Sequence, residues 1–429
     1  MSNTDDVNAN IKEDKGVFNV KLLSNGRVFH INLEDISEIY FIEDIFSFCL
    51  VGKISFYDKG GLAEFLPFTG HENIVIQYGE LEVVTIIFNI FNVDSMNPMD
   101  KIKSNSMSQI DLFLVDTNYS NLMDKRYNIS WTDKRISDII KDITKNMLSI
   151  ETFKIFENTR EKLSYFFMPY WTPSEAIRWL VERGSGSESK TAGYLYYFNT
   201  RGLNLVTINK LFQSTDVEKD ENNKIIYYEF FNKDGDKTKT YNTILDWKMD
   251  SIDNSAIKQL KGSRVLGYDF LKKKLIDESF TYTDVISKFT MLGKNTLFPD
   301  TISSPNDNFV MSGEDDADVI RNIYECDFIK RYSKQLSATI TVKGHERRYP
   351  GLLTNIKWPS TEMRDQVLNS TLDGKFLIKS VTNHFSGKQD PVFKQKIVLL
   401  KNAYTESNDK TLSKSTNTNI KVDSILGKR

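Results

Sequence analysis

The sequence predicts a mainly β protein with an α+β insertion. Aromatic residues make up 12% of the 429 residues, and together with many Ile, Val and Thr they favour pleated, half-buried surfaces. Roughly six or seven strand-like segments fill about the first hundred residues after the N-terminal tail, without a long helical pattern. A helical apolar period then replaces the alternation, and strand patterns return toward the C-terminus. The length allows roughly two to four domains.

Residues 17–117 are predicted to form a small β-barrel or a sandwich. Two alternating segments flank Asn25-Gly26, which is the strongest short hairpin signal because both residues tolerate the positive φ of a tight turn. The polar segment 1–16 that precedes them is expected to be a disordered tail. Further strands are expected between Asp, Gly and Asn turns, at residues 39–45, 48–57, 73–78, 83–93 and 107–115.

Residues 118–212 are predicted to be an inserted α+β domain. Its first helix follows Thr132, which is a plausible N-cap. The helix is indicated by apolar residues at helical spacing on one face, namely Ile136, Ile139, Ile140, Ile143 and Met147.

The second helix of the insertion carries stronger signals. Thr172-Pro173-Ser174-Glu175 is a capping box with proline in the first helical position. Gly184 is expected to end this helix in the left-handed conformation. Residues 194–198 and 203–208 then form a predicted hairpin.

The third part, residues 213–335, has uncertain boundaries. It is expected to hold strands of a second barrel and a long insertion, with a loop at 294–316 and a helix near 316–326. Residues 336–402 form the predicted C-terminal β-barrel block. Repeated Ser, Thr, Asn and Lys in residues 403–429 indicate a flexible tail.

Composition excludes several classes of function. The 56 basic and 58 acidic residues give a formal charge of -2, so no global field draws the protein to nucleic acid or to an anionic membrane. Cys49 and Cys326 are the only cysteines, and their apolar neighbours favour buried thiols in a reducing cytoplasm. No secretory signal and no apolar run near the ~20 residues that span a bilayer is present, so no membrane anchor is expected.

The sequence predicts no catalytic residue, no cofactor and no metal site. The four histidines lack metal-ligand spacing, and neither a phosphate-binding loop nor a G-x-S-x-G elbow occurs. Glu72 and Glu346 each follow a Gly-His pair. Both lie in expected turns between strands, where short polar triplets are common, so turn residues are the favoured interpretation.

The charged stretch His345-Glu346-Arg347-Arg348 lies between two apolar segments. Residues 338–343 alternate, Pro350-Gly351 allows a turn, and residues 352–358 return as a strand. The stretch is therefore predicted to be the solvated tip of a hairpin. Arg347 and Arg348 form a candidate interface loop, in which replacement by Ala is expected to leave folding intact.

Several segments together resemble the hub proteins at the tail tip of contractile-tailed bacteriophages, a fold shared with the hub part of type VI secretion spike proteins. The resemblance depends on the order of the segments, since none is a catalytic signature. Segments 42–45, 52–58 and 66–76 resemble the hub's N-terminal barrel, 167–180 and 193–198 its inserted domain, and 338–343, 351–358, 374–385 and 393–400 its second barrel.

The resemblance implies two small tube-like β-barrel domains in each chain and a homotrimer with sixfold pseudo-symmetry. Such a hub at the tail tip or baseplate joins the sixfold tail tube to the threefold central spike. The implied partners are the tail tube protein, the central spike protein, a tape-measure protein and baseplate wedge proteins, with DNA only passing through the lumen. The protein is expected to be a structural virion component, assembled in the host cytoplasm, and not an enzyme.

Two alternatives come from other classes of function. A cell-wall-degrading glycosidase of the tail would need two carboxylates facing one cleft, for which Glu72 and Glu346 are the candidates. A carbohydrate-binding or adhesion protein would use exposed aromatics such as Tyr194, Tyr196 and Trp358. The competing interpretation of each aromatic is a place in the core or an interface.

Overall fold

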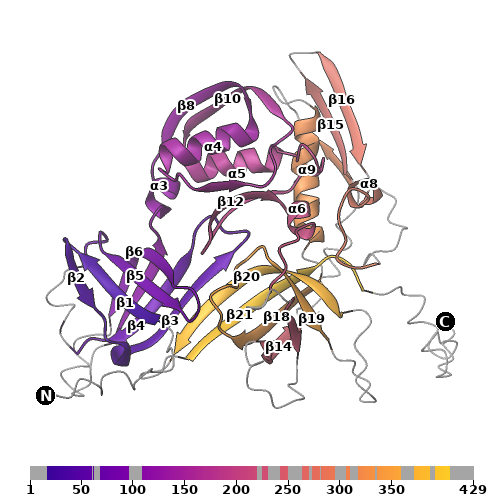
Figure 1. The fold of residues 1–429 in the computed structure, drawn as a ribbon. Helices are drawn as coiled ribbons and strands as arrows, with labels where there is room; N and C mark the ends of the chain where they lie inside the picture. Colours follow the sequence, from indigo (N-terminus) through magenta and orange to yellow (C-terminus); the bar gives the residue numbers. More distant parts are fainter. Residues whose placement is uncertain are drawn as a thin grey trace, which may run out of the picture.

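The computed structural model confirms a mainly β fold with a mixed insertion (Figure 1). Two groups of strands, at the N-terminal and C-terminal ends of the chain, lie side by side below a layer of helices and short strands. The expected tail 1–16 falls outside the described residues, and so do residues 406–429 of the tail expected at 403–429. The prediction is wrong for residues 403–405, because Ala403 is buried and the Tyr404 carbonyl accepts a hydrogen bond from the Lys294 amide at 2.8 Å. The described residues are 17–59, 61, 68–95, 109–219, 225–229, 242–249, 263–269, 273–280, 282–294, 306–309, 317–333, 336–358, 372–386 and 392–405.

The N-terminal β block follows the predicted strands closely. Its first hairpin turns at Asn25 and Gly26, which have φ of 48° and 75°, and Leu22 lies opposite Phe29 in register. The turn therefore has the positive φ values that the sequence predicts. The strands of this block are β1 (Val17–Ser24), β2 (Arg27–His30), β3 (Ile36–Asp44), β4 (Val51–Tyr57), β5 (Asn73–Gly79), β6 (Val84–Ser95) and β7 (Gln109–Asp116), with a 3-10 turn at Leu33–Asp35.

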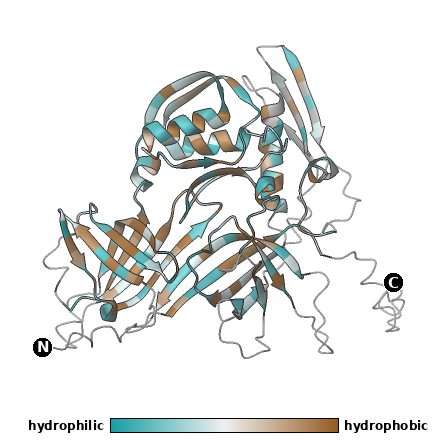
Figure 2. Ribbon diagram, viewed as in Figure 1, coloured by the Kyte–Doolittle hydropathy of each residue, from teal (hydrophilic) through white to brown (hydrophobic). Residues whose placement is uncertain are grey.

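The C-terminal β block draws strands from two parts of the chain. β18 pairs with β14 on one side and β21 on the other, while β19 pairs with β20 and β13. Along β18, buried residues alternate with more exposed ones, as expected for a sheet with one buried face. Hydrophobic and hydrophilic residues are mixed along the strands of this block (Figure 2). The strands are β13 (Tyr227–Glu229), β14 (Ile244–Met249), β18 (Leu336–Lys343), β19 (Leu353–Lys357), β20 (Gly374–Ser386) and β21 (Val392–Lys401).

One continuous 13-stranded sheet unites the two β blocks. Its main path runs β14-β18-β21-β20-β3-β4-β7-β6-β5-β1-β2. The joint is the antiparallel pair β20–β3, in register from Ser380 opposite Asp44 to Ser386 opposite Glu38. The blocks are thus connected by backbone hydrogen bonds as well as by side-chain packing.

The insertion lies above this joint and contains two amphipathic helices (Figure 1). α4 (Ile136–Met147) buries the predicted stripe of Ile136, Ile139, Ile140, Ile143 and Met147. α5 (Pro173–Arg183) buries Ala176, Ile177, Leu180 and Val181. The other elements are α3 (Tyr119–Met123), β8 (Tyr127–Arg135), β9 (Phe153–Ile155), β10 (Lys162–Trp171), the predicted hairpin β11 (Tyr194–Asn199) and β12 (Gly202–Thr207), and α6 (Ile208–Phe212).

The capping box of α5 is confirmed, but two other helix-end predictions are wrong. Thr132 lies inside β8 opposite Tyr165, and the start of α4 is capped instead by Thr159, whose Oγ1 accepts a hydrogen bond from the Ser137 amide at 2.9 Å. Gly184 is extended, with φ of -86°. The chain leaves α5 in this direction because the Glu161 carboxylate binds the Ser185 amide at 2.6 Å.

Replacing Thr172 by Ala is expected to lower the free energy of unfolding by about 1 kcal/mol. The substitution removes the hydroxyl that accepts from the Glu175 amide at 3.3 Å, leaving a donor at the helix start without its partner. Urea denaturation measures the change. The matched control is Thr132→Ala on exposed β8, for which a change under about 0.5 kcal/mol is expected; equal losses in the two variants would contradict the assignment of Thr172 as the cap.

Residues 213–335 hold a small sheet that the sequence did not predict. β15 (Ser263–Asp269) pairs with β16 (Lys274–Phe280) and with β17 (Asn306–Phe309). The prediction of a loop at 294–316 is wrong at β17, and most of that segment lies outside the described residues. The predicted helix near 316–326 is longer, since α9 runs over Ala317–Tyr332, and a short helix α8 occupies Tyr282–Ile286.

Buried apolar residues form three clusters. The first joins the N-terminal block to α4 and α5, the second lies around β11, β12, α6 and α9, and the third fills the C-terminal block. Cys49 and Cys326 are free thiols within the core, as predicted. Among the described residues, no helix is both long and apolar enough to span a bilayer.

Candidate functional site: a buried polar junction

The segment 344–352 does not form the predicted hairpin. β18 and β19 are not neighbours in the sheet, because β18 pairs with β14 and β21 whereas β19 pairs with β13 and β20. The segment instead turns inward, with Gly344 packed against the ring of Phe393. A side chain at Gly344 would overlap that ring, so this position suits glycine.

The prediction that this segment is a solvated tip is wrong for Arg348 and Glu346, which are 1% and 3% exposed. The Arg348 guanidinium donates from Nε to Glu218 Oε1 at 2.8 Å. It also donates from Nη1 to Gln395 Oε1 at 3.0 Å, and it lies over the ring of Tyr228 at 5.3 Å. A charged side chain can remain buried here because each contact replaces hydration. Arg347, in contrast, is partly exposed.

Glu218, the partner of Arg348, is itself buried and hydrogen-bonded to further side chains. Glu218 also accepts hydrogen bonds from the Tyr228 hydroxyl at 2.8 Å and from the Thr354 hydroxyl at 3.3 Å. Burial alone would lower the pKa of Arg348, but Tyr228 and Glu218 hold this pKa above its ordinary value. Burial raises the pKa of Tyr228 far above its ordinary range, so its hydroxyl remains a donor.

Gln395 extends these contacts toward the N-terminal block. Its Nε2 donates to Asn383 Oδ1 at 2.7 Å and to the His345 carbonyl at 3.0 Å. Asn383 Nδ2 in turn donates to Glu43 Oε1 at 3.0 Å. We call this chain of buried groups, Glu43, Asn383, Gln395, Arg348 and Glu218, the polar junction. It crosses the β20–β3 joint, because Glu43 belongs to β3 and Asn383 to β20.

Glu43 connects the polar junction to the insertion. Its Oε2 accepts from the Thr200 amide at 2.7 Å, in the turn between β11 and β12. Glu43 is 0% exposed, and burial raises its pKa to about 7, against the opposing effect of hydrogen bonds from Thr200 and Asn383 and of the charge on Arg201. The raised pKa means that Glu43 titrates near neutral pH.

Further contacts around the polar junction connect the same three parts of the chain. Glu346 Oε1 accepts from the Leu81 amide at 3.1 Å, between β5 and β6. Arg201 forms a bidentate ion pair with Glu82, in which Nη1 donates to Oε1 at 2.7 Å and Nη2 to Oε2 at 3.0 Å. The N-terminal block, the insertion and the C-terminal block therefore meet at one set of polar contacts.

The polar junction connects structural elements, and both glycosidase candidates accept hydrogen bonds from backbone amides. Glu72, the first glycosidase candidate, accepts from the amides of Thr69 and Gly70 at 3.1 and 2.9 Å within its own turn, and these bonds lower its pKa against the effect of burial. Glu346 accepts from a backbone amide. No cluster of three or more His, Cys, Asp or Glu able to hold a metal occurs within the described part of the chain.

The aromatic residues that suggested carbohydrate binding are not exposed. Tyr194, Tyr196 and Trp358 are 1%, 2% and 4% exposed. The Tyr194 hydroxyl donates to the Glu157 carbonyl at 3.0 Å, and Trp358 packs edge-on against Trp247. The alternative of a glycan-binding surface on these three rings is therefore wrong, and the competing interpretation of a place in the core is confirmed.

Sequence reasoning missed Glu43, Glu218, Asn383 and Gln395. Three of them carry a local signal: each occupies an inward position of an alternating strand, as Glu43 does after Ile39 and Phe41. A polar residue in the apolar register of a strand indicates a buried hydrogen-bond partner. Glu218 lies outside the strands and offers no such pattern.

The fold is similar to that of two solved tail proteins. The tail protein from Neisseria meningitidis MC58 matches with a TM-score of 0.56 and 12% identity, over 90% of this chain and 99% of that chain. The 43 kDa tail protein of prophage MuSo2 from Shewanella oneidensis gives the same four values. A Francisella PdpA-VgrG complex matches with a TM-score of 0.48 and 11% identity, over 91% of this chain and 53% of that chain. No protein-family model and no curated protein sequence matches the chain.

These matches confirm the resemblance at the level of the fold. The chain has the fold of the two tail proteins over nearly all of its length and nearly all of theirs. The interface role of Arg347 and Arg348 stays a prediction. Burial of Arg348 restricts that role to the part of the segment around Arg347.

Proposed function

We propose that the protein is a structural, non-enzymatic component of a phage tail, acting as a homotrimeric hub at the tail tip or baseplate. The observation that carries the proposal is the 13-stranded sheet, in which two β blocks of one chain are joined through β20 and β3. A chain with two β blocks suits a position between a sixfold and a threefold structure, because three copies present six blocks.

The ends of the sheet support an assembly through neighbouring copies. β14 and β2 stand at the two ends of the strand path, and an end strand offers backbone groups to another chain. We propose that residues 17–117 and 336–402 supply the two tube-like barrels, with 118–212 as the inserted domain and 213–335 contributing strands and an insertion. The polar junction would then keep the two barrels of one copy at a constant angle.

The proposed partners follow from this position. The sixfold tail tube protein would contact one side of the ring and the threefold central spike the other, with tape-measure and baseplate wedge proteins as further neighbours. DNA would pass through the lumen. The proposed location is the virion tail, after assembly in the host cytoplasm.

The proposal predicts a trimer of the 49.6 kDa chain in solution. Light scattering after size-exclusion chromatography, at micromolar protein concentration, measures the mass directly. Labelling of the protein in purified particles, followed by electron microscopy, should place it at the tail tip. The proposed hub role would be contradicted if the protein were strictly monomeric and absent from purified particles.

A further inference from the structure

The outward face of the C-terminal block carries four exposed lysines. Lys394 and Lys396 alternate along β21 with the buried Gln395 and Ile397, so both point away from the core. Across the sheet, Lys343 lies opposite Lys394. On the next strand pair, Lys248 lies opposite Thr339. We call the four exposed lysines, Lys248, Lys343, Lys394 and Lys396, the basic face.

Several charged side chains on the rest of this sheet, beyond β21, are paired with charges of opposite sign. On the part formed by β20, β3, β4 and β7, outward charges form ion pairs between strands: Lys53–Asp111 at 2.6 Å, His384–Glu38 at 2.7 Å and Lys379–Asp44 at 3.3 Å. Within the described residues, no carboxylate forms an ion pair with Lys248, Lys394 or Lys396. Among the described residues, positive charge is therefore less compensated by ion pairs on β14 and β21 than on β20, β3, β4 and β7.

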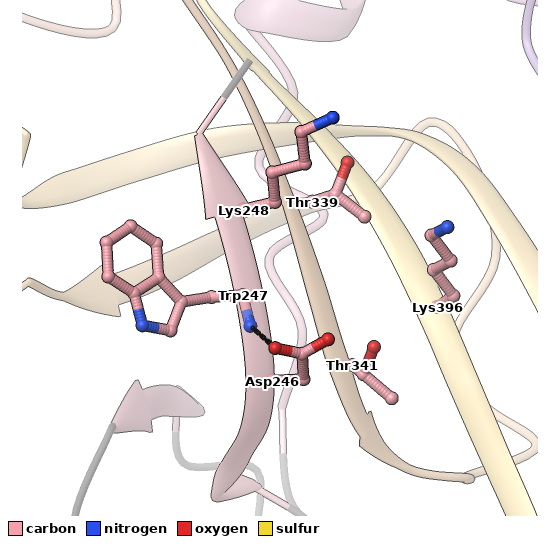
Figure 3. Close-up of a pocket in the computed structure, with 6 residues that line it drawn as sticks. All are labelled: Asp246, Trp247, Lys248, Thr339, Thr341 and Lys396. Carbon is pink, nitrogen blue, oxygen red and sulfur yellow. Dashed lines mark hydrogen bonds between the residues drawn. The ribbon is translucent and has the colours of Figure 1, made fainter.

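A hollow of about 260 Å³ lies beside Lys248 and Lys396, two lysines of the basic face (Figure 3). Lys248 and Lys396 extend beside it, and the hydroxyls of Thr339 and Thr341 project between them. Asp246 is the one acid in its lining, and it accepts a hydrogen bond from the Trp247 amide at 2.8 Å. The Trp247 ring points away from the hollow. The hollow is thus lined by ammonium and hydroxyl donors, with a net positive charge.

Two lysines of the basic face lie directly opposite each other on neighbouring strands. Like charges directly opposite each other on neighbouring strands are destabilising, and Lys343 opposite Lys394 is such a pair. An anion bound across the two strands would offset this repulsion. The exposed lysines of neighbouring strands are therefore spaced along one face that an extended polyanion can contact.

We propose that the basic face binds the phosphate backbone of nucleic acid without sequence preference. Lysine and threonine side chains are common donors to phosphate oxygens, and contacts of this kind carry no sequence information. An acidic protein partner fits less well, because stable protein interfaces are anchored by buried aromatic or Arg residues, and the aromatic residue in the lining, Trp247, directs its ring away from the hollow. This inference goes beyond the proposed structural role and does not depend on trimer formation.

The expected binding is weak and strongly dependent on salt. Neutralising three to four phosphates predicts a slope of about -3 for log K against log salt, and non-specific dissociation constants near 10⁻⁴ to 10⁻⁶ M. Affinity should therefore fall roughly fifty- to hundredfold between 50 and 200 mM salt. Two duplexes of unrelated sequence should bind equally well.

Fluorescence anisotropy of a labelled 30-base-pair duplex, titrated with the full chain, tests the proposal. The double variant Lys394→Gln/Lys396→Gln is expected to bind at least about tenfold more weakly, with a salt slope smaller by about 2. The matched control, Lys141→Gln/Lys145→Gln, makes the same charge change at exposed positions of α4 and should change affinity less than about twofold. The Lys394/Lys396 variant should also unfold at the same or a higher urea concentration, because it removes repulsion.

Three results would overturn the inference. The first is absence of binding by the wild-type chain at 50 mM salt, and the second is an equal loss in the two double variants. The third is displacement of the duplex by poly-glutamate as effectively as by an equal charge of unlabelled DNA, which would indicate an acidic protein surface as the ligand.

Discussion

Replacing Arg348 by Ala is expected to lower the free energy of unfolding by about 3–5 kcal/mol, because the change leaves Glu218 buried without its counter-ion. Glu218 would keep only the hydroxyls of Tyr228 and Thr354 as partners. Gln395 Oε1 would lose the Arg348 donor and keep the His345 amide at 3.0 Å, and the ring of Tyr228 would lose the guanidinium that covers it. Urea denaturation followed by circular dichroism measures the change.

The neighbouring arginine provides a matched control. Arg347 is partly exposed, and the ion pairs of the described residues do not include it; Arg347→Ala should change stability by less than about 0.5 kcal/mol. The double variant Arg348→Met/Glu218→Gln removes both charges and should cost less than the sum of the two single changes. Similar losses for Arg347→Ala and Arg348→Ala would show that the pair with Glu218 contributes little.

This prediction revises the expectation from sequence that both arginines could be replaced without effect on folding. Four successive polar residues between apolar segments are typical of an exposed turn. The position of Arg348 depends on Glu218 and Gln395, which are distant in the sequence. A local pattern could therefore not distinguish the buried arginine from the exposed one.

The parts of the fold that were predictable are those with local causes. Asn25-Gly26 specifies its turn through positive φ, and Thr172 with Glu175 specifies a helix start through reciprocal hydrogen bonds. The stripe of α4 is set by a period of 3.6 residues. Each signal lies within a few residues of the structure that it determines.

The pairing of strands could be predicted less well from the sequence. Alternation in β18 and β19 correctly indicated two strands, and Pro350-Gly351 suggested that they form a hairpin. Any strand with an apolar face satisfies this pattern, so the pattern does not determine which strand pairs with it in the sheet. The β20–β3 joint likewise depends on backbone bonds between segments more than 300 positions apart in the chain, and the single sheet that joins the two blocks could not be predicted.

The polar junction could be predicted from the sequence only in part. Glu43, Asn383 and Gln395 each occupy an inward position among apolar residues, so their burial could have been predicted from alternation. Their mutual contacts could not. Glu43, the buried carboxylate at one end of the polar junction, is expected to have a large effect on how stability depends on pH.

Glu43→Gln is expected to remove about 3 kcal/mol of pH dependence from the unfolding free energy between about pH 4.5 and 7. The folded-state pKa of Glu43 is about 7, above its ordinary value of 4.5, because burial disfavours the carboxylate. The folded protein therefore holds this proton more tightly than the unfolded chain does. The stabilising contribution is complete below the unfolded pKa and is lost as the pH rises through the folded pKa.

The slope of stability against pH, measured by urea denaturation from pH 4.5 to 8, is the quantity that tests this prediction. The absolute stability of the variant is less informative, because an amide places a donor beside the Thr200 amide or Asn383 Nδ2 at every pH. Glu72→Gln is the matched control, since Glu72 is a buried carboxylate whose pKa is lowered; its own contribution is lost only as the pH falls through that pKa. The Glu72 variant should therefore keep the wild-type slope above about pH 5. If the Glu43 variant kept that slope as well, the proton on Glu43 would not be coupled to folding, and the polar junction would join the two β blocks equally well at acidic and neutral pH.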